Sequence, residues 1–141
     1  MVTLFALAFL VSNGRVLLAR RVNAKFGNGL YSLIGGKVEL RETARQAVQR
    51  EVLEEVALNI SESNFELVHT FHRKGPDGEL IALCFKVDIS NLPAPINCEP
   101  DKCDDLALFD LNQLPGNIIP AHKQAIECIK QKISYSEHGW E

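Results

Sequence analysis

The stretch from Gly35 to Leu58 constrains this chain more than any other. Two glycines follow an apolar run there, and the residues beyond them predict an amphipathic helix. On a helix of about 3.6 residues per turn, Glu51, Glu54 and Glu55 lie three and four positions apart and therefore share one face. The neighbouring face carries an apolar stripe of Val48, Val52 and Val56. That stripe can pack into a core while the acidic face gathers like charges.

Carboxylates gathered on one helical face repel one another unless a cation offsets them. Carboxylate oxygens are hard ligands, and a site with room for water and phosphate oxygens suits Mg²⁺ or Mn²⁺. The alternative is a solvated acidic face, which is the usual role of glutamate-rich helices. Taken alone, the helix leaves both interpretations open.

The spacing of residues around the helix favours the metal site. From Gly36, five residues lead to Glu42, seven more lead to Arg50-Glu51, and Val52-Leu53-Glu54-Glu55-Val56-Ala57-Leu58 follows. This pattern resembles the Nudix box, Gly-x5-Glu-x7-Arg-Glu-U-x-Glu-Glu-x-Gly-U, in which U is aliphatic. Ala57 stands where the box has a glycine. The chain is identified as a member of the Nudix hydrolase family, and it resembles the MutT-like nucleotide pyrophosphohydrolase branch.

Ala57 departs from the box near the helix end, where a left-handed residue commonly terminates a helix. Alanine adopts positive φ at a cost, whereas Asn59, two residues later, tolerates it better. We therefore expect the helix, from Glu42 to about Leu58, to run slightly longer than usual. Arg41 occupies a variable position and bears only on the loop before the helix.

The resemblance implies roles for individual residues of the box. The implied ligands of Mg²⁺ or Mn²⁺ are the Gly35 carbonyl, Glu51, Glu54 and Glu55. The implied structural residues are Gly36, Glu42 and Arg50. Arg50 also orients the catalytic glutamates, and Lys37 lies where it can meet a substrate phosphate.

A second segment that resembles the family is Glu99-Pro100-Asp101-Lys102-Cys103. It is similar to the Glu-Pro-Glu-Lys-Cys run of small Nudix nucleotide hydrolases, in which a glutamate outside the box approaches the metal ions. Glu99 is the matching residue, with an exposed loop acid as the alternative. The general base is left open between Glu54 and Glu99.

Residues before the box supply candidates for substrate binding. Arg20 and Arg21 end a predicted strand, and a guanidinium is suited to phosphate, although a solvated strand end is the alternative. Only one of them can face a cleft if the strand continues regularly through both. Phe26, Tyr31 and Ser32 are candidates for a nucleobase pocket, because rings stack on bases and a small polar group contacts a base edge. For Phe26 and Tyr31, core packing is the alternative.

The rest of the chain predicts an α/β fold. Strands are predicted over residues 2–11, 15–19, 30–34, 65–73, 80–89 and 105–109. Asn13-Gly14 predicts a hairpin turn, and a last helix is predicted from Ala121 to about Ser134, opened by Pro120. With the resemblance, this predicts one Nudix domain over residues 1–141, an α/β/α sandwich with a mixed β-sheet. The tail from Tyr135 has no pattern that we can interpret.

Composition restricts the partners. A net charge of −3 predicts neither a nucleic-acid-binding surface nor an anionic membrane partner. The apolar first eleven residues lack a cationic segment and a cleavage site, so they indicate a buried strand rather than a signal peptide. The four cysteines show no paired CxxC spacing, which indicates free thiols in the cytoplasm and no structural zinc.

The predicted reaction is hydrolysis of a nucleoside diphosphate linked to another group. The favoured substrate is a (d)NTP, either 8-oxo-dGTP or another nucleotide, giving a monophosphate and pyrophosphate. The family member that hydrolyses oxidised purine triphosphates reads the base with Trp-Pro-Asp-Asp before its last helix. Here Ile119-Pro120-Ala121-His122 lacks those carboxylates, so that substrate cannot be carried over.

Alternative functions stay open. One is a pyrophosphatase for ADP-ribose or a nucleotide sugar. Another is a catalytically silent nucleotide-binding Nudix module, although such a module has no need to keep three repelling glutamates. A homodimer is common in the family, but the sequence shows no interface.

Overall fold

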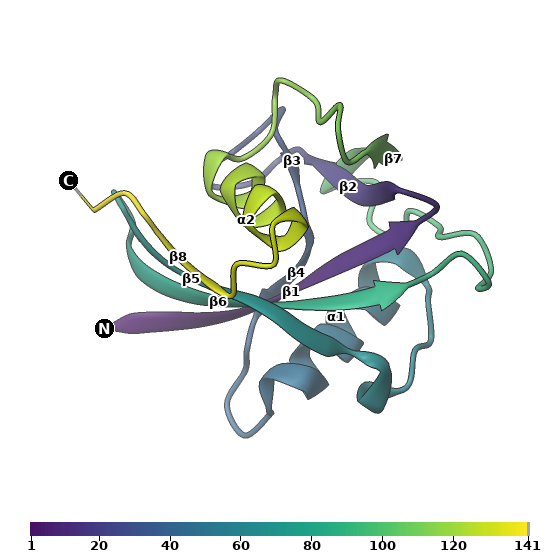
Figure 1. Ribbon diagram of the computed structural model, residues 1–141, viewed down its shortest axis with the longest axis horizontal. Coiled ribbons are helices and arrows are strands. Elements are labelled where there is room, and N and C mark those ends of the chain that lie inside the picture. Colours follow the sequence, from purple (N-terminus) through teal and green to yellow (C-terminus); the bar gives the residue numbers. More distant parts are fainter. Residues whose placement is uncertain (141) are drawn as a thin grey trace.

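The computed structural model describes residues 1–140 as a mixed β-sheet with one helix on each face (Figure 1). The sheet runs in the order β3-β2-β1-β6-β5-β8, with β4 also paired to β1 and β7 to β2. The strands are β1 (Val2–Ser12), β2 (Arg15–Arg21), β3 (Tyr31–Ser32), β4 (Ile34–Lys37), β5 (Glu66–Gly75), β6 (Gly78–Asp88), β7 (Cys103–Asp110) and β8 (Tyr135–His138). The helices are α1 (Ala44–Val56) and α2 (Pro120–Lys130), with a 3₁₀ turn, η1, at Glu62–Asn64.

The central strand is β1, which the apolar N-terminal run predicted. It pairs in parallel with β6 along its length, from Val2 opposite Glu79 to Val11 opposite Asp88. Its other edge is shared, because β4 pairs antiparallel to the middle of β1, from Phe5 to Ala8, and β2 to its end. Asn13 and Gly14 both have positive φ, as the hairpin between β1 and β2 requires.

Two apolar cores lie on the two faces of the sheet. One packs the α1 stripe of Val48, Val52 and Val56 against the sheet, including Leu10 and Phe85. The other packs Ala121, Ala125 and Ile126 of α2 against residues that include Phe9 and Phe71. A strand buried on both faces needs apolar residues in succession, and residues 6–10 of β1 are all buried. The predicted α/β/α sandwich with a mixed sheet is confirmed.

The boundaries of α1 differ from the prediction. The Thr43 hydroxyl caps the helix by accepting a hydrogen bond from the Gln46 amide, and the Gln46 side-chain oxygen accepts one from the Thr43 amide. The helix ends at Val56, and Ala57 itself adopts the left-handed conformation with φ 61°, its amide bonded to the Leu53 carbonyl. The predicted extension of the helix is therefore wrong. The next residue, Leu58, is buried in the core and fixes where the chain must turn.

The C-terminal part also differs. α2 ends at Lys130 rather than near Ser134, and the tail forms β8, which no sequence pattern indicated. β8 pairs in parallel with β5, from Thr70 opposite Tyr135 to Arg73 opposite His138. Buried His69 bridges this junction, because its ring contacts the Ile133 carbonyl at 2.7 Å and the Ser136 hydroxyl at 2.8 Å.

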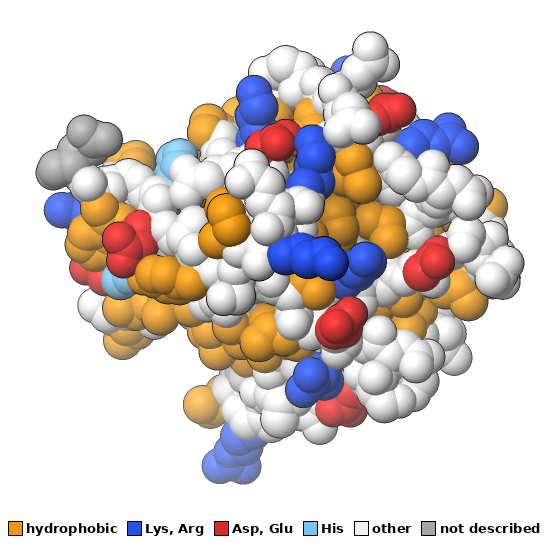
Figure 2. Space-filling view, in the orientation of Figure 1, with side chains coloured by type: hydrophobic (Ala, Val, Ile, Leu, Met, Phe, Trp, Pro, Cys, Tyr) orange, Lys and Arg blue, Asp and Glu red, His pale blue; other side chains and the backbone are white. Residues whose placement is uncertain are grey.

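Other surface features agree with the composition. Acidic and basic side chains are interspersed on the face shown in Figure 2, so that face has no extended patch of one sign. Within residues 1–140, no helix combines the length and apolar character needed to cross a bilayer. The free thiols are Cys84, Cys98, Cys103 and Cys128.

Candidate active site

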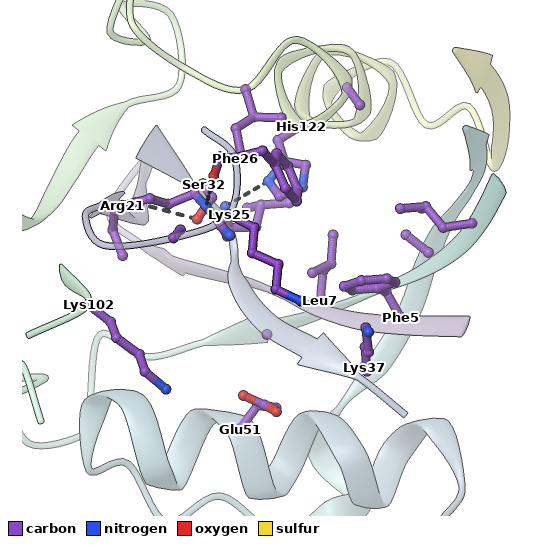
Figure 3. A pocket seen from close by; sticks show the side chains of 18 of the residues that line it. Phe5, Leu7, Arg21, Lys25, Phe26, Ser32, Lys37, Glu51, Lys102 and His122 are labelled. Atoms are coloured by element: carbon purple, nitrogen blue, oxygen red, sulfur yellow. Dashed lines mark hydrogen bonds between the residues drawn. The ribbon is translucent and has the colours of Figure 1, made fainter. Parts of the chain in front are cut away.

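A cleft of about 780 Å³ opens between α1 and α2. Figure 3 shows Glu51 on the α1 side and Phe26, Ser32 and His122 on the α2 side. The lining combines acidic and basic groups from distant parts of the chain. The acidic groups include Glu51, Glu55 and Glu99, and the basic ones include Arg20, Arg21, Lys25, Lys37, Arg73 and Lys102.

Gly35 and Gly36 bring the sheet and α1 into close contact at this cleft. A Cβ on Gly35, whose φ is +144°, would lie 2.2 Å from the Ala6 carbonyl oxygen on β1. A Cβ on Gly36 would lie 2.7 Å from Oε1 of Glu51. The position of Gly35 therefore requires glycine, whereas Gly36 lets the Glu51 carboxylate approach the backbone of β4, and a side chain there would displace that carboxylate.

Arg50 ties the loop before α1 to the acidic face of the helix. Its Nη2 donates to Oε1 of Glu42 at 2.7 Å and to the Lys37 carbonyl at 3.3 Å, while Nη1 donates to Oε1 of Glu51 at 2.9 Å. These carboxylates raise the pKa of Arg50, with the Glu42 hydrogen bond as the main cause. The Arg50 hydrogen bonds and the Glu39 amide in turn lower the pKa of Glu42. Arg50 thus fixes the orientation of Glu51.

Glu54 lies apart from the other two glutamates of the acidic face. Its side chain is 52% exposed, lies 3.4 Å from Nη1 of Arg50 and does not line the cleft. Glu51 and Glu55 do line it. Within the part of the chain that the structure describes, no three acidic, histidine or cysteine side chains converge into a complete metal-ligand cluster.

Glu55 has the most perturbed carboxyl group of the cleft. Burial, reinforced by contact with Glu51 and by the charge of Glu99, raises the pKa of Glu55 to about 10, while the Gly35 amide opposes this shift. Its Oε2 atom is buried and has no hydrogen-bond partner among residues 1–140. An orphaned carboxyl oxygen beside a second carboxylate is the environment that a hard divalent cation satisfies. Because Mg²⁺ retains waters and takes phosphate oxygens, an incomplete protein ligand set also fits it.

Glu99 reaches the cleft from the turn that precedes β7. Its carbonyl accepts the amides of Lys102 and Cys103, each at 2.9 Å, and its own amide donates to the Asn97 side chain at 3.1 Å. This turn holds Glu99 on the cleft lining, where its charge acts on Glu55. The segment that resembles the family therefore lies beside the box glutamates.

Arg20 and Arg21 both line the cleft. The expectation that only one would do so assumed regular alternation along β2. The pairing with β7 shifts register between them, since Arg20 lies opposite Asp105 and Arg21 opposite Cys103. Asp104 is the extra residue of this bulge, and its carboxylate binds Nε of Arg20 at 2.7 Å.

The three nucleobase candidates are distributed differently. Phe26 is 44% exposed and lines the cleft, with the guanidinium carbons of Arg21 and Arg73 at 4.9 and 5.7 Å from its ring centre. Ser32 also lines the cleft, and its hydroxyl donates to the Ala19 carbonyl at 3.4 Å. Tyr31 lies outside the lining, because its buried ring packs on Phe109 and its hydroxyl bonds Asp105. Of the three nucleobase candidates, Tyr31 is the one that packs in the core instead of lining the cleft.

Several cleft residues were absent from the sequence-based candidates, and two of them, His122 and Arg73, have notable contacts. His122 in the first turn of α2 accepts the Leu33 amide on Nδ1 at 3.0 Å, and burial together with Arg21 and Arg73 lowers the pKa of His122 to about 3. Arg73 on β5 is 13% exposed and binds Asp77 at 2.8 Å. The Ile119–His122 segment drew attention to the position of His122 but not to its contacts, and no sequence pattern indicated Arg73.

Several curated proteins are similar to this chain. It is 31% identical over 115 residues to the NAD-capped RNA hydrolase NudC of Chromobacterium violaceum, covering 82% of this chain and 41% of that protein. It is 32% identical to an ADP-ribose pyrophosphatase of Methanocaldococcus jannaschii, covering 73% and 59%. It is 36% identical to an oxidized purine nucleoside triphosphate hydrolase of Danio rerio, covering 79% and 69%. The chain thus spans about half the length of the first two relatives.

Solved structures and a family model agree with these similarities. The crystal structure of a MutT NUDIX hydrolase from Burkholderia pseudomallei superposes with a TM-score of 0.81 at 27% identity, covering 90% of this chain and 97% of that one. The model of the NUDIX domain matches residues 2–131. With this match, with the box glycines pressed against β1 and Glu51, and with the acidic cleft, the chain belongs to the Nudix hydrolase family.

Proposed function

We propose that this protein hydrolyses nucleoside triphosphates to a monophosphate and pyrophosphate. The observation that carries the proposal is the cleft in which the Glu51 and Glu55 carboxyls face several cationic side chains. Such a cleft can bind a diphosphate between a metal-binding end and basic groups. The similarity to a relative named as an oxidized purine nucleoside triphosphate hydrolase supports this substrate class.

The residues that would hold Mg²⁺ or Mn²⁺ are Glu51, Glu55, Glu99 and the Gly35 carbonyl. The orphaned Oε2 of Glu55 and its contact with Glu51 support this assignment. When bound, the ion supplies neutralisation of the diphosphate charge and a more acidic water. Glu54 lies outside the cleft lining, so we rank it after these residues as a ligand.

The protein's own groups would bind and orient the nucleotide. Lys37, Arg20 and Arg21 line the cleft and would donate hydrogen bonds to phosphate oxygens. Arg50 would hold Glu51 in place through its 2.9 Å contact. Either Glu99 or Glu54 would accept the proton of the attacking water.

A product analysis tests the proposed reaction. The protein is incubated with Mg²⁺ or Mn²⁺ and a panel of triphosphates, ADP-ribose and nucleotide sugars, and the products are separated by anion exchange. Pyrophosphate released from triphosphates supports the proposal. AMP formed from ADP-ribose alone would support the alternative suggested by the relative named ADP-ribose pyrophosphatase. Nucleotide binding without turnover would indicate a silent binding module.

Substitutions test the assigned groups. We expect Glu51→Gln to lower kcat about 100-fold or more, because a charged group that acts on the reacting phosphates is removed. Glu66→Gln, an exposed change on β5, is the matched control and should leave kcat unchanged. If Glu54→Gln matches wild type while Glu99→Gln is inactive, Glu99 is the base. Wild-type activity in Glu51→Gln would contradict the assignment.

A further inference from the structure

His122 is placed where it can contact the base of a bound nucleotide. It lies in the first turn of α2 and lines the cleft together with Phe26 and Ser32 (Figure 3). Its ring centre lies 6.1 Å from that of Phe71, which is buried in the core on the α2 face of the sheet. The ring is therefore held by packing on one side and open to the cleft on the other.

The hydrogen bond from Leu33 fixes the tautomer of His122. A backbone amide can only donate, so Nδ1 of His122, which receives it at 3.0 Å, carries no proton. The single ring proton must therefore be on Nε2. Among residues 1–140, Nε2 has no hydrogen-bond acceptor, so this donor is left for a ligand. Burial and the charges of Arg21 and Arg73 hold the ring in this neutral form.

The groups around His122 are also hydrogen-bond donors. Arg21 and Arg73 lie near enough to act on its charge, and both guanidinium groups lie over the exposed ring of Phe26. We call Arg21, Phe26, Arg73 and His122 the Phe26 compartment. Its aromatic ring provides a surface on which a base can stack.

The cleft also contains carboxylates, but they lie outside the Phe26 compartment, and two of them, Asp77 and Glu79, have side-chain partners. Asp77 accepts a hydrogen bond from Arg73 at 2.8 Å, and Glu79 contacts the ring of His72 at 3.2 Å. Within the compartment itself, the polar side chains that an amino group on a base would meet are donors. A keto oxygen, by contrast, would meet donors that are ready to bind it.

Bases differ in the edge that they present to such a set of donors. Guanine and hypoxanthine present O6 and N7, two adjacent acceptors, whereas adenine presents N7 beside an amino donor. Uracil and thymine present O4 where cytosine presents an amino group. A compartment whose polar side chains are all donors thus favours binding of the base with a keto group over the one with an amino group.

We propose that His122 is a specificity-determining residue whose Nε2–H donates to a keto oxygen or ring nitrogen of the substrate base. With it, the Phe26 compartment selects 6-oxopurine and 4-oxopyrimidine nucleotides over their amino counterparts. This inference rests on the proposed function for its substrate, a nucleotide, but not on the identity of the bond that is cleaved.

Matched pairs of nucleotides test the selection. We expect kcat/KM of the wild type to be at least about tenfold higher for ITP than for ATP and for UTP than for CTP, the size of effect that a correctly paired base edge produces. Equal values for ITP and ATP, or a preference for ATP, would overturn the proposal. The pairs keep the ring system, ribose and phosphates constant.

His122→Asn separates base reading from a structural role. The asparagine oxygen lies near the position of Nδ1 and can still accept the Leu33 amide, but no donor remains at the position of Nε2. We expect the ITP to ATP ratio to fall to within about threefold of one. His138→Asn on β8, outside the cleft lining, is the control and should keep the wild-type ratio. If His122→Asn kept the wild-type ratio of kcat/KM for ITP to that for ATP, the assignment would be overturned.

Binding measurements separate this inference from the proposed reaction. If no triphosphate is cleaved, the proposed function fails, and calorimetry with IMP and AMP still reports base preference. Tighter binding of IMP by the wild type, lost in His122→Asn, supports the inference without any turnover. Equal binding of IMP and AMP, or binding of neither at millimolar concentration, overturns it.

Discussion

The same cleft shifts the pKa values of two residues in opposite directions: it raises that of Glu55 and lowers that of His122. The pKa of Glu55 in the folded protein, about 10, lies above its unfolded value of about 4.3. Its contribution to stability is therefore fully present below about pH 4.3 and is lost as the pH rises towards 10. The folded pKa of His122, about 3, lies below its unfolded value of about 6.5. Its contribution is therefore present above pH 6.5 and is lost as the pH falls.

Glu55→Gln should make the stability of the metal-free protein less dependent on pH. In the wild type, we expect the free energy of unfolding to fall between pH 7 and 9, by up to about 1.4 kcal/mol per pH unit, because unfolding releases the proton that Glu55 holds. Urea titrations in EDTA measure this slope. Added Mg²⁺ should stabilise the wild type more than the variant. Equal slopes in the two proteins would contradict the environment described for Glu55.

At the scale of elements, the sequence predicted the turns and helices whose formation depends on residues close together in the chain. The Asn13-Gly14 turn and the valine stripe of α1 are encoded within a few residues, and both are found. β8 was not predictable, because its pairing partner is β5 and its anchor, His69, is 67 residues away from Ser136. The bulge at Asp104 likewise depends on pairing between distant strands.

The end of α1 gives a test at this scale. Ala57 is exposed and has φ 61°, so Ala57→Gly should stabilise the protein by about 1 kcal/mol through relief of the left-handed conformation. Ala44→Gly, at the first residue of the same helix, should instead destabilise it by roughly 0.5–1 kcal/mol. Urea midpoints compare the two. A destabilised Ala57→Gly variant would show that the backbone is not strained there.

At the scale of the whole molecule, the cleft joins segments that only the fold brings together. The box and Glu99 could be identified from the sequence because each has its own motif. Arg73 and His122 could not, since they come from β5 and from α2, which packs against β5 without any shared sequence pattern. The tail completes this region, as Trp140 donates from Nε1 to the His72 carbonyl at 3.0 Å.

Gly139→Val should loosen the tail. Gly139 has φ +83°, and a Cβ there would lie 2.1 Å from the Lys74 carbonyl oxygen, so we expect a loss of about 1–3 kcal/mol in the free energy of unfolding. Hydrogen exchange should accelerate first in the amides of β5 and β8. Gly116→Val, where a Cβ would meet nothing within 4 Å, is the control. Unchanged exchange in β5 would contradict the packing described.

The Leu33 amide that holds His122 precedes Gly35 by two residues, on the short segment that leads into β4. A mismatched base that displaces the imidazole would therefore also displace the Gly35 carbonyl, which we proposed as a ligand of the metal ion. Misalignment there slows chemistry in addition to the loss of binding at the base. We expect steady-state kinetics to show a lower kcat, as well as a higher KM, for ATP and CTP than for ITP and UTP.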